Sequence, residues 1–198
     1  TASNNTAVGA DALTANTTAS NNTGIGHSAL FSNTTGTGNS GLGQNALYST
    51  TTGNYNTSSG QGSLQLNTSG SNNTGLGQSA LGSNTTADNN TAVGKGALAA
   101  NTTGTNNVAV GANALDAATT ATNNTAIGYN TLTANTTGGQ NTALGQNALA
   151  TNTTGSGNTG IGNGALDAST TAANNTAVGH SAASLVSTGT QNVAVGAL

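Results

Sequence analysis

The sequence predicts an all-β protein, a parallel β-solenoid (β-roll) of about twelve coils with 17 residues each. Three observations carry this prediction. Asn recurs twelve times between Asn5 and Asn192, always 17 residues apart. Gly recurs four residues later with the same step, from Gly9 to Gly196. Short segments rich in β-branched residues lie between these Asn and Gly turns, which is the pattern that a solenoid coil requires.

The repeat is continuous over residues 1–198, so we predict a single array without a second domain. Numbered from Asn5 as position 1, its consensus is N-T-A-V-G-x-x-A-L-x-x-N-T-T-G-x-N. The predicted coils begin at Asn5, Asn22, Asn39, Asn56, Asn73, Asn90, Asn107, Asn124, Asn141, Asn158, Asn175 and Asn192. Coils that stack at the ~4.8 Å spacing of β-strands would give a rod on the order of 55 Å long.

Two apolar columns of the repeat are the predicted core. Position 4 is aliphatic in eleven of twelve repeats, and position 9 is Leu in ten. The exceptions, Ser59 at position 4 and Ala183 at position 9, are predicted weak points, with Leu185 and Val186 near enough to compensate for Ala183. Filling the first of them by Ser59→Val is expected to stabilise the fold by ~1 kcal/mol.

Position 3 lies on the opposite strand face from positions 2 and 4, because successive residues of a strand point to opposite sides. Only Ala, Gly and Ser occupy position 3, which predicts that something packs closely against it. We expect this strip to be the contact along which rods associate side by side, most simply as three parallel chains.

The composition excludes several classes of function. The net charge is −3, and Lys95 is the only basic residue apart from two His. Such a chain lacks the basic stripe needed to bind nucleic acid and the polybasic patch needed to bind anionic lipid. No apolar run approaches the ~20 residues of a membrane-spanning helix. The charged residues and His fall at positions 6, 7, 10 and 16, which are predicted to face solvent: Asp11, His27, Asp88, Lys95, Asp116, Asp167 and His180.

The Asn column at position 1 predicts a ladder along the rod. Stacked amides can each donate a hydrogen bond to one neighbour and accept one from the other; the alternative is that each Asn caps only its own turn. The predicted ladder residues are Asn5, Asn22, Asn39, Asn73, Asn90, Asn107, Asn124, Asn141, Asn158 and Asn175. Of the Thr pair at positions 13 and 14, one column should face outward and the other inward.

The segments Asn107–Gly111 and Asn192–Gly196 read N-V-A-V-G and resemble the signature of YadA-type trimeric autotransporter adhesin heads. The full 17-residue unit also resembles arrays in bacterial and phage tail-fibre-like proteins. This resemblance covers the whole chain. It implies a left-handed coil, assembly as a homotrimer, and binding to host or matrix surfaces.

The expected function is therefore that of a structural rod in an extracellular fibre or adhesin, either a cell-surface appendage or a phage tail fibre. Its expected partners are copies of itself, in a homotrimer or filament, and a ligand on a host or matrix surface. We also expect the chain to be a window of a longer array or to have its ends covered by further subunits. The alternative is an ice-binding β-solenoid that uses Thr ranks at positions 14 and 16, such as Thr35 with Thr37 and Thr103 with Thr105.

Catalysis is not expected, and neither a cofactor nor a metal ion is predicted. A nucleophile needs an adjacent base that is held by a third group, whereas His27 and His180 lie nine coils apart, about 43 Å at strand spacing. Asp116 and Asp167 lie three coils apart, about 14 Å, which is too far for paired carboxylates.

The candidate surface contacts are aromatic side chains. Phe31 and Tyr48 share position 10 of successive coils and should stack about 4.8 Å apart, while Tyr129 lies at the solvent-facing position 6. These residues could bind carbohydrate or protein. The alternatives for Phe31 and Tyr48 are a lateral ladder without a ligand and a contact with a neighbouring subunit.

Overall fold

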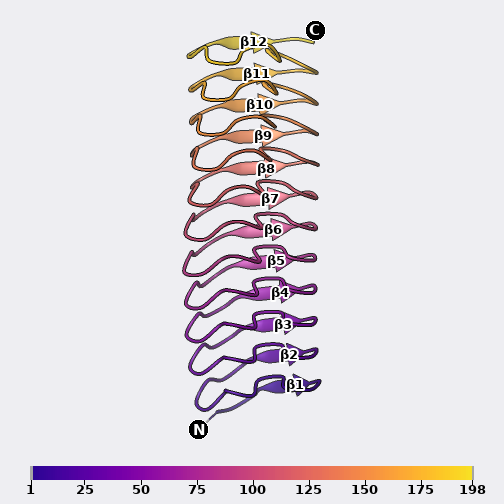
Figure 1. Ribbon diagram of the computed structural model, residues 1–198, viewed down its shortest axis with the longest axis vertical. Helices are drawn as coiled ribbons and strands as arrows, with labels where there is room; N and C mark the ends of the chain where they lie inside the picture. Colours follow the sequence, from indigo (N-terminus) through magenta and orange to yellow (C-terminus); the bar gives the residue numbers. More distant parts are fainter. Residues whose placement is uncertain (1, 198) are drawn as a thin grey trace.

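A computed structural model describes residues 2–197, and it is a rod of stacked coils (Figure 1). Twelve parallel strands form one sheet in sequence order and wind through about eleven turns. The strands are β1 (Thr6–Val8), β2 (Thr23–Ile25), β3 (Ser40–Leu42), β4 (Thr57–Ser59), β5 (Thr74–Leu76), β6 (Thr91–Val93), β7 (Val108–Val110), β8 (Thr125–Ile127), β9 (Thr142–Leu144), β10 (Thr159–Ile161), β11 (Thr176–Val178) and β12 (Val193–Val195). The predicted fold class is confirmed.

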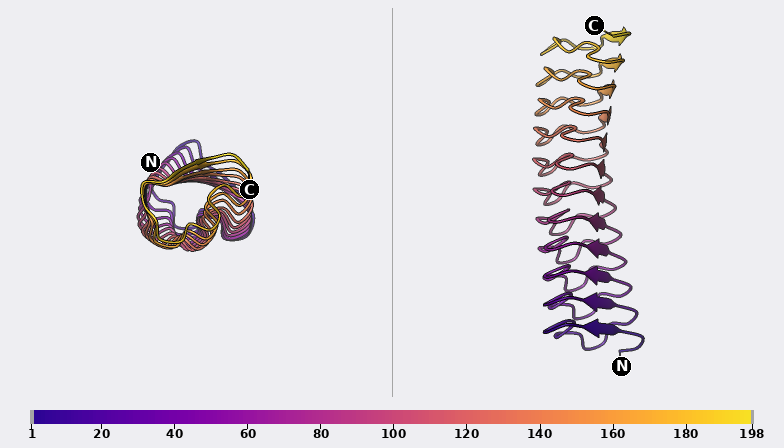
Figure 2. Two further views of the ribbon diagram at one scale, coloured as in Figure 1. Left: turned by 90° about the horizontal axis from the view of Figure 1, so that it is seen from above. Right: turned by 90° about the vertical axis from the view of Figure 1, so that its right-hand side faces the viewer.

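The register of the sheet follows the sequence repeat. Each strand residue pairs with the residue 17 positions further on, as Thr6 does with Thr23 in β1 and β2. Seen from the side, the strands stack above one another in a single column along the length of the rod (Figure 2). Among residues 2–197 there is no helix, and so none with the length and hydropathy that crossing a membrane requires.

Hydrogen bonds between coils continue outside the three-residue strands. The backbone N–H of Leu30 donates to the carbonyl of Ala46 over 3.0 Å, and that of Thr51 donates to the carbonyl of Thr68 over 2.9 Å. Equivalent bonds recur in the following coils. The polar backbone of the turns is therefore satisfied by the neighbouring coil, which allows the turns to stack as regularly as the strands.

Glycine at position 5 is required by the stacking itself. In these residues φ lies between +121° and +137°, a region that side-chain-bearing residues rarely adopt. A Cβ atom on Gly111 would also lie only 2.3 Å from the carbonyl oxygen of Gly128 in the next coil. Both the backbone conformation and the close approach of the coils explain why this column tolerates no other residue.

Leucine at position 9 adopts an unusual conformation. Its φ lies between +50° and +55° in all ten Leu residues, from Leu13 to Leu166. A left-handed residue costs about 1–2 kcal/mol, but complete burial of a Leu side chain returns roughly 1.5–3 kcal/mol. Nine of these side chains, from Leu30 onward, are fully buried, so the conformation is maintained by the core that it creates.

The core is a column of Leu at position 9 with Ala at position 8 and small residues at position 3. Position 3 points inward: Ala92 and Ala109 are fully buried. A Cβ atom on Gly24 would lie 3.4 Å from Cγ of Leu13, in van der Waals contact. The close packing predicted at position 3 is therefore present, but the partner is Leu of the same chain.

Two predictions about the strand faces are wrong. Position 4 points outward, with Leu42 exposed by 49% and Leu144 by 44%, so it is not part of the core. Position 3 is buried, so it cannot be the strip along which rods associate. The alternation of side chains along a strand shows which residues share a face, but not which face points inward. The inward face is determined by packing inside the coil, where Leu at position 9 leaves room only for small residues.

The predicted weak points change accordingly. Ser59 is half-exposed on the outer face, so Ser59→Val would fill no cavity, and the expected core stabilisation does not follow. At position 9, Ala183 is partly buried, and Val186 packs against the core beside it. Leu185 does not compensate, since 86% of its side chain is exposed.

Candidate interaction surface

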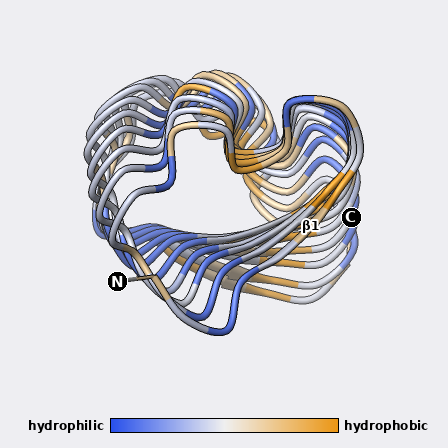
Figure 3. Cartoon of the chain, turned by 90° about the horizontal axis from the view of Figure 1, so that it is seen from below, coloured by the Kyte–Doolittle hydropathy of each residue, from blue (hydrophilic) through white to orange (hydrophobic). Residues whose placement is uncertain are grey.

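The outer face of the sheet, formed by positions 2 and 4, is the candidate interaction surface. It carries a column of Thr or Ser, with Val at two places, beside a column of Val, Ile and Leu. Every described position-4 side chain is exposed or half-exposed. Figure 3 shows apolar residues on the strands as well as in the inward-folded part of the coil. A solvent-facing column that stays aliphatic in eleven of twelve coils suggests a surface that is covered in function.

The hydroxyl groups of this face are free. Within residues 2–197, none of the Thr and Ser hydroxyls at position 2 makes an intramolecular hydrogen bond. The hydroxyls at position 13 behave differently: Oγ1 of Thr34 donates to the carbonyl of Thr51, and Oγ1 of Thr51 donates to that of Thr68. The outer face therefore offers unengaged hydroxyls and methyl groups in regular alternation.

No charged residue occupies positions 2 or 4. At position 6, beyond the turn glycine, Gln44, Gln61 and Gln78 form a row in which each amide lies near the next. The charged side chain of Lys95 continues that row. The outer face is thus an uncharged strip with a polar border.

The Asn residues at position 1 form a buried column along the rod, and it contains the predicted ladder of amides: in seven of the eleven steps within residues 2–197, Nδ2 of one Asn donates to Oδ1 of the Asn in the preceding coil. In each step, the backbone N–H of one Asn donates to Oδ1 of the Asn in the preceding coil, as Asn39 does to Asn22 over 2.8 Å. Its Nδ2 donates to the position-15 carbonyl of its own coil, as Asn39 does to Gly53 over 2.7 Å. Each side chain therefore both bridges to the adjacent coil and caps its own turn, which combines the two alternatives. The column also includes Asn56 and Asn192.

Position 12 forms a second buried Asn column that sequence reasoning missed. Nδ2 of Asn84 donates to Oδ1 of Asn67 over 2.8 Å and to the carbonyl of Ala87 over 3.1 Å. The sequence signal for this column is the Asn that begins the repeated N-T-T triplet. It is easily overlooked because the Thr pair that follows it is more conspicuous. In both columns, some hydrogen bonds of the buried amides link successive coils and others close a turn of the same coil.

The Thr pair divides as predicted. At position 13 the Thr side chains are mostly half-buried, while position 14 is exposed in every described coil. Position 16, the second Thr rank of the ice-binding alternative, is mostly half-buried, and Thr37 donates both its N–H and its hydroxyl to Oδ1 of Asn54. Positions 14 and 16 therefore do not form a free pair of Thr ranks.

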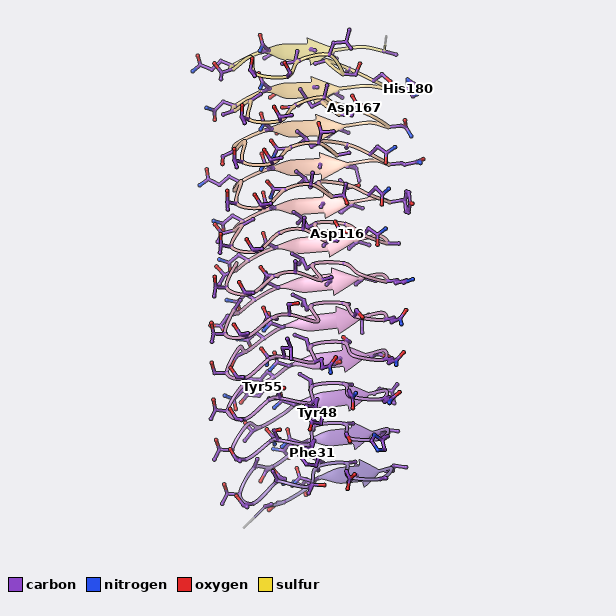
Figure 4. All side chains as sticks on the ribbon, viewed as in Figure 1. Phe31, Tyr48, Tyr55, Asp116, Asp167 and His180 are labelled. Atoms are coloured by element: carbon purple, nitrogen blue, oxygen red, sulfur yellow. The ribbon has the colours of Figure 1, made fainter. Side chains whose placement is uncertain are left out.

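Among the candidate contact residues, Phe31 and Tyr48 stack with their ring centroids 5.1 Å apart and their planes 5° from parallel (Figure 4). Both are half-buried, so each ring covers one face of the other and leaves mainly its edge to solvent. This geometry favours the lateral-ladder alternative. Tyr129 does not join them; it stands alone at position 6 with 51% of its side chain exposed. Sequence reasoning also passed over Tyr55, an exposed residue at position 17.

The titratable residues are dispersed over the rod. Oδ1 of Asp116 accepts a hydrogen bond from Thr133 over 2.7 Å, and Nδ1 of His27 lies 3.1 Å from the hydroxyl of Ser28. In the described part of the chain, no three His, Cys, Asp or Glu side chains lie close enough together to hold a metal ion.

Comparison of the chain with protein-family models, with curated proteins and with solved structures finds no match.

Proposed function

We propose that the chain is a rigid structural rod of an extracellular fibre or adhesin, on a cell surface or a virion, and that copies of it associate through the outer sheet face. The observation that carries the proposal is the aliphatic column at position 4, which is outward-facing and uninterrupted except at Ser59. Homotrimeric assembly and a left-handed coil remain predictions from the resemblance to adhesin heads.

A second copy of the same rod is the best-matched occupant for this face. Eleven spacings of ~4.8 Å give a strip ~53 Å long, and a width of ~10 Å gives ~500 Å² per copy, so a pair would bury close to the ~1,000 Å² of a small specific interface. Because a second rod carries the same side chains at the same ~4.8 Å spacing, each side chain of one rod can face an equivalent side chain of the other. The lack of charge in positions 2 and 4 removes like-charge repulsion from the contact.

Sedimentation velocity tests association of the wild-type chain against the triple variant Val93→Glu/Val110→Glu/Ile127→Glu. The expected wild-type mass is a multiple of 18.6 kDa, and the variant should be a folded monomer, because Glu side chains buried in an apolar contact lose their hydration without gaining a partner. The matched control, Thr86→Glu/Thr103→Glu/Thr120→Glu, places the same charges at the exposed position 14 and should leave the mass unchanged. A wild-type chain that stays monomeric at tens of micromolar would contradict the proposal.

Ice binding is the second candidate, and the free hydroxyls at position 2 favour it. Thr occupies position 2 in nine of twelve coils and a methyl-bearing side chain occupies position 4 in eleven, so both form ranks at the spacing of the coils. If this face orders water, the monomeric chain should inhibit ice recrystallisation, and the Glu triple variant should lose that activity. Growth of ice crystals unaffected by the wild-type chain would eliminate this candidate.

A further inference from the structure

A hollow of about 440 Å³ opens on the side of the rod at the fourth to sixth coils. Its lining residues come from positions 7, 10 and 11, and none of them belongs to a strand. Position 10 holds Tyr48 and Gln65 in the two coils before Gly82, which has no side chain. The hollow therefore lies where two small residues, Gly82 and Ala99, follow larger side chains at position 10.

The lining is neutral and chemically mixed. Leu66, exposed by 48%, and Ala99 provide an apolar wall. Ser79, Ser83 and Gln65 line the remainder. Within residues 2–197 their side-chain oxygen and nitrogen atoms make no intramolecular hydrogen bond, so donors and acceptors are available to a ligand. The volume lies within the ~300–1,000 Å³ of small-ligand sites.

We propose that this hollow binds a neutral saccharide unit, with its hydroxyls on Ser79, Ser83 and Gln65 and its apolar ring face against Leu66. A pyranose ring presents both kinds of surface at once. Anionic ligands are disfavoured because no Lys or Arg lines the hollow. The proposal rests on the proposed function in that a rod of a fibre or adhesin meets a glycan-bearing surface, but it does not depend on association of the rods.

Filling the hollow is the direct test. Gly82→Gln should preserve the fold, since the same position holds Gln65 one coil earlier and a Cβ atom on Gly82 would lie 3.2 Å from its nearest neighbour, the carbonyl oxygen of Ser79. Ala150→Gln makes a matched change at position 10 four coils further on, away from the hollow. Ser83→Ala removes one hydroxyl at position 11, where other coils carry Ala, and should weaken binding about threefold to tenfold.

The measurement is saturation-transfer NMR on the full chain with the methyl pyranosides of glucose, galactose and mannose, with N-acetylglucosamine, and with glucuronic acid as an anionic control. At least one neutral sugar should receive transfer from the wild-type chain and from Ala150→Gln, with the signal lost in Gly82→Gln. Absence of transfer to every neutral sugar, or transfer that survives Gly82→Gln, would overturn the proposal. Sedimentation measures association of the rods independently of sugar binding. A negative NMR result would therefore leave the proposed outer-face interface unaffected, and a monomeric chain in sedimentation would leave the proposed saccharide site unaffected.

Discussion

At the scale of single residues, buried amides hold the coils together in addition to apolar side chains. The position-12 column shows what happens when one amide is missing. Oδ1 of Asn33, Asn101 and Asn152 is buried without a hydrogen-bond partner. In each case the next coil has no Asn at position 12: the residues there are Thr50, Ala118 and Ser169. An unpaired buried acceptor destabilises the folded state by about 1–3 kcal/mol.

The substitution Ala118→Asn should therefore stabilise the rod. Its Nδ2 would reach Oδ1 of Asn101 and the carbonyl of Ala121, in the manner of Asn84 with Asn67 and Ala87. We expect the free energy of unfolding to rise by about 1 kcal/mol, measured by urea denaturation. Ala117→Asn, at the half-buried neighbouring position 11, is the control and should have little effect. A lower free energy of unfolding for Ala118→Asn would mean that the coil packs too tightly around Ala118 to accept the larger Asn side chain.

Leucine at position 9 shows where residue-level reasoning from sequence reaches its limit. The column is correctly predicted as core, because ten Leu residues in register can be buried together only along a shared interior. Its positive φ could not be predicted, since propensities assign such backbone angles to Gly, Asn and Asp. The left-handed conformation of Leu115 is a consequence of tertiary packing, which overrides a local preference.

At the scale of the coil, the period predicts the strands but not which of their faces is inward. Alternation places positions 2 and 4 together correctly, and apolar character then misassigns position 4 to the interior. The deciding feature is the size of position 3: Ala109 fits against the Leu column, whereas a Val in its place would not. A column restricted to Ala, Gly and Ser is the available signal, but small size indicates close packing without identifying the partner.

The turn glycine at position 5 gives the sharpest test at this scale. Gly111→Ala adds a Cβ atom 2.3 Å from Gly128 in a conformation with φ of +134°. We expect destabilisation by more than about 3 kcal/mol. Since each coil contacts only its neighbours, the fault should be local. Limited proteolysis should cleave near residue 111, and thermal unfolding should separate into two steps.

Gly139→Ala is the matched control for this change. Its φ is not positive, the nearest atom to the added Cβ is 3.0 Å away, and Ala173 occupies the same position 16 in a later coil. It should unfold in one step at nearly the wild-type temperature. Equal effects of the two substitutions would show that coil contact at position 5 is looser than the stacking requires.

At the scale of the whole molecule, the rod is nearly uncharged, and its only regular apolar surface is the outer sheet face of the described strands. Its architecture was predictable from the sequence because an exact 17-residue period leaves few folds open. The candidate surface was not, because it depends on which strand face is inward. The stacking of Phe31 with Tyr48 followed from the period alone, whereas the hollow at Gly82 appears only when the side chains around it are placed.

Position 3 lies inside the coil and position 4 outside it, and we propose that another copy covers position 4. The chain contains no cysteine, so single-cysteine variants report each site without background. Ala109→Cys probes position 3, where Ser58 shows that a side chain of similar size is accepted. Val110→Cys probes position 4, and Thr103→Cys probes the exposed position 14.

The most direct measurement is the rate of thiol alkylation of these three variants, each alone and each combined with the association-breaking pair Val93→Glu/Ile127→Glu. Alone, Thr103→Cys should react quickly, while Ala109→Cys and Val110→Cys should both be protected. In the dissociated background Val110→Cys should become reactive, and Ala109→Cys should stay protected. Rapid labelling of Ala109→Cys together with protection of Val110→Cys in both backgrounds would contradict this arrangement, because it would place the two strand faces the other way round.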